Sequence, residues 1–175
     1  ANQFWIATRF LESITLLSGF LFVTRSWKVY PNVLFTIYTI VTVLIVLTIL
    51  EWQIFPICYV AEKGQTQFKI ISEYVIIGIL FTALFFLYKS RNYFDRRIFY
   101  FLVISVVSTI VSEFCFTLYF SNYGFFNQIG HYFKLLSFFM IYKANVETAY
   151  IKPTEVIYRE LKVSREKINQ YNRQL

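Results

Sequence analysis

Cysteine, proline, glycine and charge are all scarce in this chain of 175 residues. Its 2 Cys are too few for a disulfide scaffold or a four-cysteine zinc module. Its 3 Pro and 5 Gly, beside 22% aromatic residues, exclude a collagen-like or low-complexity protein. Charged residues make up 15% of the chain and hydrophobic residues 57%. Soluble domains average roughly 25% charged and roughly 45–50% apolar residues, so the composition indicates a membrane protein.

Motifs for common enzyme chemistry are missing as well. The sequence contains no GxxxxGK[ST], GxGxxG, HExxH or GxSxG, so nucleotide cradles and the common hydrolase sites are absent. The single histidine, His131, leaves few options for acid–base catalysis. We therefore expect no catalytic residues and no enzymatic activity from this chain.

Five apolar stretches are long enough to cross a bilayer, which takes roughly 20 helical residues. One of them, VLFTIYTIVTVLIVLTIL, is rich in β-branched residues, but its length without a turn signal favours a helix over a strand. The predicted fold is all-α, an integral membrane helical bundle of five transmembrane helices in residues 1–150. A C-terminal cytoplasmic signalling helix is expected in residues 151–175. The expected spans are 4–23, 33–54, 70–88, 98–120 and 129–146.

The Lys and Arg residues are distributed unequally between the two ends of these spans. Thirteen of the 17 lie in the 24–32 connection, in the 89–97 connection or after residue 142. Cytoplasmic segments carry an excess of basic residues, so these regions are expected in the cytoplasm and the N-terminus outside the plasma (inner) membrane. The net charge of +7 is then a topology signal, and the expected partner is the lipid bilayer rather than nucleic acid. An outside N-terminus without a signal peptide predicts an odd number of further spans upstream.

Six ionisable side chains fall within the expected spans, where each is costly in hydrocarbon. With a rise of about 1.5 Å per residue, all six lie roughly 0–12 Å below the outer boundary. Two pairs are three residues apart and share a helix face, Arg9 with Glu12 and His131 with Lys134. The predicted ligand-binding or sensing residues are Arg9, Glu12, Glu73, Glu113, His131 and Lys134.

Two interpretations of this polar layer stay open. It forms either a small pocket, open toward the outside or the outer leaflet, that binds a ligand or senses a proton, or a set of buried ion pairs that fix the packing of the helices. Small polar residues that continue the layer inward are suited to close helix contact, as at Ser105, Ser108, Thr109 and Ser112. No cofactor is predicted. Metal or haem ligation through His131 is the alternative, although no HxxH or HxxxH spacing accompanies it.

The chain changes character after Pro153, where it becomes charged and helical. Apolar and small residues there follow the a/d positions of a heptad pattern, which is typical of a coiled coil. We expect a parallel homodimer through this helix, leading to a cytoplasmic output domain. The alternative is an amphipathic helix on the inner leaflet. The a/d positions are Ile157, Leu161, Ser164, Ile168, Tyr171 and Leu175.

Four segments together resemble the bacterial membrane-associated sensor domains of the third class, over most of the chain up to about residue 160. The resemblance implies a multi-span sensory input module with an odd number of further N-terminal spans. It also implies an output domain of the PAS, histidine-kinase or diguanylate-cyclase type. The family's motif positions correspond to the six ionisable residues of the polar layer. The segments are QFWIATRFLES (3–13), FKIISEY (68–74), SEFCFTLYFSNYGF (112–125) and GHYFKLLSFFMIYKANVET (130–148).

The sequence therefore predicts a membrane-embedded sensory input domain without catalytic activity of its own. We expect it to detect a small ligand or a physicochemical stimulus near the outer face and to signal through its C-terminal helix to a cytoplasmic kinase or cyclase. The alternative is a transporter or proton relay that uses the intramembrane carboxylates. A relay needs polar groups through the inner half of the spans, which offers only Ser, Thr and Gly. This favours a blind pocket.

Overall fold

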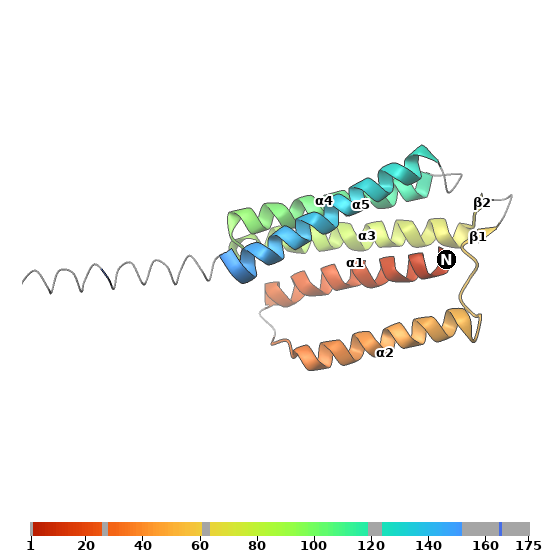
Figure 1. Cartoon of the computed structure of the whole chain (residues 1–175), viewed down its shortest axis with the longest axis horizontal. Coiled ribbons are helices and arrows are strands. Elements are labelled where there is room, and N and C mark those ends of the chain that lie inside the picture. The colour runs from red at the N-terminus through yellow and green to blue at the C-terminus, as the bar shows by residue number, and fades with distance from the viewer. Residues whose placement is uncertain (1, 26–27, 61–63, 119–123, 152–164, 166–175) are drawn as a thin grey trace, which may run out of the picture.

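The structure, a computed structural model, describes residues 2–25, 28–60, 64–118, 124–151 and 165. Long helices that alternate in direction dominate it (Figure 1). The all-helical fold class is confirmed for these residues. The long helices are α1 (Asn2–Arg25), α2 (Pro31–Leu50), α3 (Gln67–Lys89), α4 (Arg96–Leu118) and α5 (Phe125–Val146).

Short elements join these helices. Strands β1 and β2 form an antiparallel pair in the connection between α2 and α3. A single 3₁₀ turn, η1, precedes α4, and a π-helical turn, η2, follows α5. We call the end of the bundle that carries β1, β2 and the start of α1 the hairpin end (Figure 1). The short elements are β1 (Tyr59–Val60), β2 (Gly64–Gln65), η1 (Arg91–Tyr93) and η2 (Glu147–Ile151).

Four of the described helices, α1 to α4, are long and apolar enough to cross a membrane. They correspond to the first four expected spans, of which the second extends beyond the end of α2 and the last two residues of the fourth, 119–120, lie outside the described residues. The fifth expected span, 129–146, lies in α5, which has 22 residues but carries Asn127, Gln128, His131 and Lys134 in its first half. Composition alone therefore does not mark α5 as a span. The expected signalling helix, with its heptad positions, lies outside the described residues apart from 151 and 165.

The expected boundary at residue 54 was wrong, because α2 ends at Leu50. The N–H groups of Ile54 and Phe55 both donate to the Thr48 carbonyl, at 3.1 and 3.4 Å, and Gln53 adopts a positive φ of 48°. This turn satisfies a carbonyl at the helix end and reverses the chain. The apolar composition continues past the turn, so hydropathy alone extended the predicted span by four residues.

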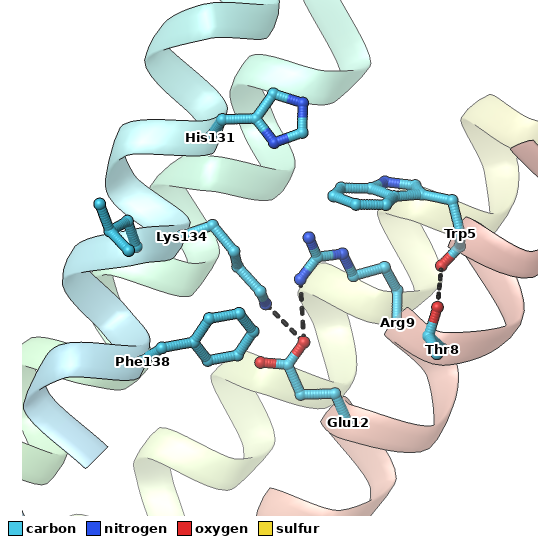
Figure 2. Close-up of a pocket in the computed structure, with 8 residues that line it drawn as sticks. Trp5, Thr8, Arg9, Glu12, His131, Lys134 and Phe138 are labelled. Atoms are coloured by element: carbon cyan, nitrogen blue, oxygen red, sulfur yellow. Dashed lines mark hydrogen bonds and ion pairs between the residues drawn. The ribbon is translucent and has the colours of Figure 1, made fainter. Parts of the chain in front are cut away.

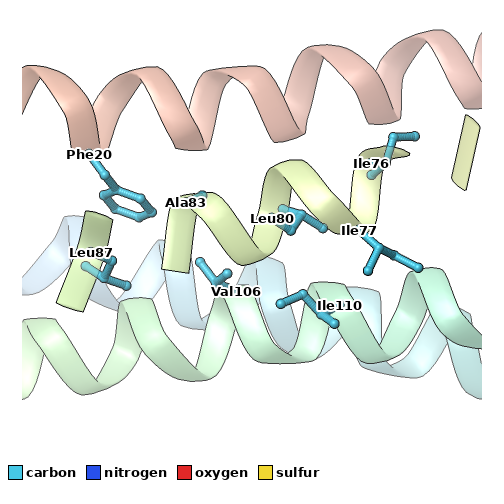
Figure 3. Packing of buried hydrophobic residues seen from close by; sticks show 8 residues of the cluster. All are labelled: Phe20, Ile76, Ile77, Leu80, Ala83, Leu87, Val106 and Ile110. Carbon is cyan, nitrogen blue, oxygen red and sulfur yellow. The ribbon is translucent and has the colours of Figure 1, made fainter. Parts of the chain in front are cut away.

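The closest helix contacts form a row in which α1 contacts α3, α3 contacts α4, and α4 contacts α5 (Figure 1). The two end members of this row, α1 and α5, also meet through side chains. Helix α3 therefore lies between α1 and α4. Its apolar face meets both neighbours in a cluster of fully or nearly buried side chains (Figure 3). The residues drawn are Phe20 of α1, Ile76, Ile77, Leu80, Ala83 and Leu87 of α3, and Val106 and Ile110 of α4.

Helix α2 lies apart from the row, beside α1 (Figure 1). Of its 20 residues, all of them described, only Ile49 is buried. A hydrogen bond between the hydroxyls of Thr15 and Tyr38 joins it to α1. Its outward side chains are almost all apolar, which suits a helix surrounded by lipid.

The contact between α4 and α5 is made by small and polar residues. Ser137 of α5 is hydrogen bonded to Ser105 at 2.9 Å and to Thr109 at 2.6 Å. The Ser112 hydroxyl donates to the Gly130 carbonyl at 2.8 Å. Small side chains allow membrane helices to approach closely, and the close contact predicted for this stripe is confirmed.

Gly130 is expected to be intolerant of a side chain. A Cβ atom there would lie 2.7 Å from Cε1 of Phe116, whose ring is buried and cannot swing into open space. We expect Gly130→Ala to lower the free energy of unfolding in detergent micelles by about 1–3 kcal/mol. Gly78→Ala in α3 is the matched control, because a Cβ atom added at Gly78 would have nothing within 4 Å. Equal stability of the two variants would contradict the close contact.

Candidate functional site

Four of the six predicted site residues meet in the half of the bundle nearer the hairpin end. Figure 2 shows three of them, Arg9, Glu12 and Lys134. Oε2 of Glu12 accepts hydrogen bonds from Nη1 of Arg9 at 2.9 Å and from Nζ of Lys134 at 2.5 Å. Oε1 of Glu113 lies 3.4 Å from Nε of Arg9 and 3.8 Å from Nζ of Lys134. These four side chains, which we call the charged cluster, come from α1, α4 and α5.

The charged cluster is buried, and its formal charges sum to zero. The side chains of Arg9, Lys134 and Glu113 are 6%, 4% and 1% exposed, and that of Glu12 is 20% exposed. Two positive and two negative groups balance, which is the condition under which charges are tolerated away from water. Neither carboxylate oxygen of Glu113 accepts a hydrogen bond from the described residues. Glu113 is therefore held by the two cations through ion pairing.

Local sequence explains how each helix contributes to the cluster. Arg9 and Glu12 are one turn apart on α1, so they pair within the helix. Lys134 lies on the same face of α5 as Gly130 and Ser137, the residues in close contact with α4. Close packing of α5 on α4 therefore brings the Lys134 ammonium deep into the bundle.

Within the described structure, Glu73 makes no ion pair with the charged cluster. Its Oε1 atom lies 3.5 Å from Nζ of Lys69, one turn earlier on α3, and both side chains are 1% exposed. Lys69 was expected to precede the span 70–88, whereas it lies within α3. The i,i+4 spacing of the two residues was the signal that could have revealed this second pair.

His131 has ring partners rather than a charged partner in the described structure. Its imidazole centroid lies 5.3 Å from that of Trp5 and 5.1 Å from that of Phe116, both in edge-on geometry. The Arg9 guanidinium lies over the Trp5 ring, 4.1 Å from its centroid. Among the described residues, no three His, Cys, Asp or Glu side chains form a group that could hold a metal ion.

A pocket of about 500 Å³ adjoins the charged cluster between α1 and α5 (Figure 2). Both walls combine charged and apolar side chains. The charged ones were predicted from the sequence, but Leu135 and Phe138 were missed, although Phe138 is one turn after Lys134 on the same face of α5. The pocket is lined by Trp5, Thr8, Arg9 and Glu12 of α1 and by His131, Lys134, Leu135 and Phe138 of α5.

Membrane-length helices around a buried cluster of paired charges are typical of a helical membrane protein. The family described as MASE3, membrane-associated sensor domain, matches residues 1–153. The chain belongs to this family, and the resemblance of its four sequence segments is confirmed. The chain is therefore a membrane-associated sensor domain. Domains of this family are non-catalytic by themselves. No curated protein and no solved structure matched the chain.

Removal of one charge from the cluster is expected to be costly. Lys134→Met leaves the buried carboxylates of Glu12 and Glu113 with Arg9 as their remaining partner, so one negative charge is uncompensated. We expect the free energy of unfolding in detergent to fall by about 3–5 kcal/mol. The double variant Lys134→Met, Glu12→Gln restores neutrality and is expected to recover part of this loss.

The control for these two variants is Lys143→Met, which removes a lysine from the exposed last turn of the same helix. Its stability is expected to stay within about 0.5 kcal/mol of the parent protein. A double variant no more stable than Lys134→Met alone would show that neutrality is not what holds the cluster together.

Cys58, in the connection that precedes β1, is a free thiol with only 1% of its surface exposed. Burial raises the pKa of the Cys58 thiol, so less of the reactive thiolate is present at pH 8. In a Cys115→Ala background, we expect iodoacetamide to alkylate Cys58 at least tenfold more slowly in the folded protein than in SDS. The rate should continue to rise above pH 9. Equal rates in both states would contradict the buried position.

Proposed function

We propose that this chain is the input module of a signalling protein, which detects a small ligand or physicochemical stimulus at the pocket beside the charged cluster. The hairpin end then faces the outside of the plasma membrane, as the distribution of Lys and Arg favours. The signal leaves through α5 and the helix expected in residues 151–175 to a cytoplasmic kinase or cyclase, within a homodimer. Membership of the sensor family supports the sensory role.

The observation that carries this proposal is the way α1 and α5 meet. They are the end members of the row α1–α3–α4–α5, and the pocket lies between them. The ion pair of Glu12 with Lys134 and the ring contact of Trp5 with His131 bridge the two helices. Any ligand or change of charge that alters these contacts alters the spacing of α1 and α5.

Helix α5 is suited to carry such a displacement across the membrane. As the fifth span, its 22 residues would cover about 33 Å, close to the roughly 30 Å of a bilayer core. Hydrogen bonds join it to α4, and an ion pair of 3.8 Å between Arg97 and Glu147 joins the start of α4 to the turn after α5. We infer that α4 and α5 move as one unit against α1.

The alternative, a transporter or proton relay, requires a polar path through the other half of the bundle. Between α1, α3 and α4, that half is filled by apolar side chains such as Phe20, Leu87 and Val106 (Figure 3). Water and ions have no favourable partners in such packing. This supports a blind sensory pocket over a conducting path.

The proposal is tested by joining the chain through residue 175 to a histidine-kinase catalytic core and measuring autophosphorylation in membranes. Glu113→Gln leaves the cluster with one excess positive charge. We expect this to change kinase output about fivefold or more, since 1 kcal/mol of bias shifts a two-state ratio by about that factor. His131→Ala, which removes a ring contact that bridges the pocket, is expected to change it as well.

The matched control is Glu51→Gln, which neutralises an exposed carboxylate at the end of α2 and outside the cluster. Its output should equal that of the parent fusion, and membrane levels of all variants are compared by immunoblot. Unchanged output in Glu113→Gln and His131→Ala, with normal membrane levels, would reject the sensory role of this site.

A further inference from the structure

We propose that the pocket between α1 and α5 binds a lipid quinone, a neutral planar ring with carbonyl oxygens and an apolar tail. This inference rests on the proposed function and names the class of ligand for the same site. It follows from the depth of the pocket, the nature of its walls and the charge balance at its base.

On the proposed five-span topology, the polar base of the pocket lies below the outer surface of the bilayer. Glu12 is 10 residues from the start of α1, and Lys134 is nine residues from the start of α5. At about 1.5 Å per residue, and with the expected spans beginning at residues 4 and 129, these groups lie roughly 8–12 Å inside the outer boundary of the bilayer core on the proposed topology. Phospholipid headgroups stay at the membrane surface. A ligand that reaches this base therefore has its polar part inside the hydrocarbon.

The walls of the pocket suit a ring that enters from the lipid. Leu135 and Phe138 are 67% and 52% exposed, so the α5 wall continues onto the outer surface of the bundle. Trp5 lines the opposite wall, with its indole against the Arg9 guanidinium. Aromatic side chains pack favourably against another ring in offset or edge-on geometry. The volume of about 500 Å³ is in the range of sites for small organic ligands.

The charge balance favours a neutral ligand with acceptor oxygens. Arg9 and Lys134 are already offset by Glu12 and Glu113, so an anionic ligand would leave an uncompensated charge in a medium of low dielectric constant. A guanidinium has five N–H donors, and Arg9 directs only Nη1 and Nε at carboxylates in the described structure. Carbonyl oxygens can accept from the donors that are left. Oε1 of Glu12 has no partner among the described residues and can accept from the hydroxyl of a quinol.

Tryptophan fluorescence provides a direct binding assay, because Trp5 lines the pocket and the chain has only two other tryptophans. In a Trp27→Phe, Trp52→Phe background, the protein is placed in lipid nanodiscs and titrated with decylubiquinone. We expect saturable quenching of Trp5. Phe138→Ala, which removes an exposed wall residue, is expected to weaken binding at least tenfold.

Phe139→Ala is the matched control, since Phe139 is also exposed on α5 but does not line the pocket. It should bind decylubiquinone like the parent. Quenching that does not saturate, or that is equal in Phe138→Ala and Phe139→Ala, would show partition into the lipid and overturn the proposal. Displacement of decylubiquinone by equimolar oleate would overturn the preference for a neutral head, and displacement by dodecylbenzene would overturn the role of the carbonyl groups.

The kinase fusion separates failure of this inference from failure of the proposed function. If Glu113→Gln changes the output while decylubiquinone does not bind, the ligand class is wrong and the sensory role stands. If decylubiquinone binds and Phe138→Ala prevents it, while no variant of the charged cluster changes the output, the quinone site stands and the sensory role is overturned.

Discussion

Neutralisation of charge inside an apolar medium is the constraint on which the rest of this bundle depends. Arg9, Glu12, Glu113 and Lys134 are tolerated together because their charges cancel within a few ångströms. The cancellation requires three helices to hold their faces toward one point. It ties the rotation of α1, α4 and α5 to one another, and it leaves a polar base on which a pocket can form.

The packing around the charged cluster is uneven. Helices α4 and α5 are held by hydroxyl hydrogen bonds and by the tight fit of Gly130 against Phe116. Helices α1, α3 and α4 share an apolar cluster. Across the pocket, by contrast, α1 and α5 meet through side-chain tips. The closely packed helices α4 and α5 therefore face α1 across a space large enough for a ligand.

Composition and periodicity were sufficient to predict long apolar helices and a layer of six ionisable residues that contains the four of the charged cluster, because depth and shared helix faces follow from sequence spacing. They were not sufficient for Glu73, whose partner Lys69 lies on its own helix. Nor did they identify the particular ring contact of His131 with Trp5, which joins residues more than 100 positions apart. The end of α2 was missed because hydropathy continues where the backbone turns.

The way each charge is offset also has a bearing on biosynthesis. Helices α1 and α3 each contain a partner for their own charge, Arg9 with Glu12 and Lys69 with Glu73, so each can leave the translocon singly as a nearly neutral segment. Glu113 and Lys134 have no such partner within their own described helices. On the proposed five-span topology, the charges of Glu113 on α4 and Lys134 on α5 offset each other only when the two helices form a helical hairpin. The entry of these two helices into the bilayer is then coupled, and α5 has to be synthesised before α4 is stably inserted.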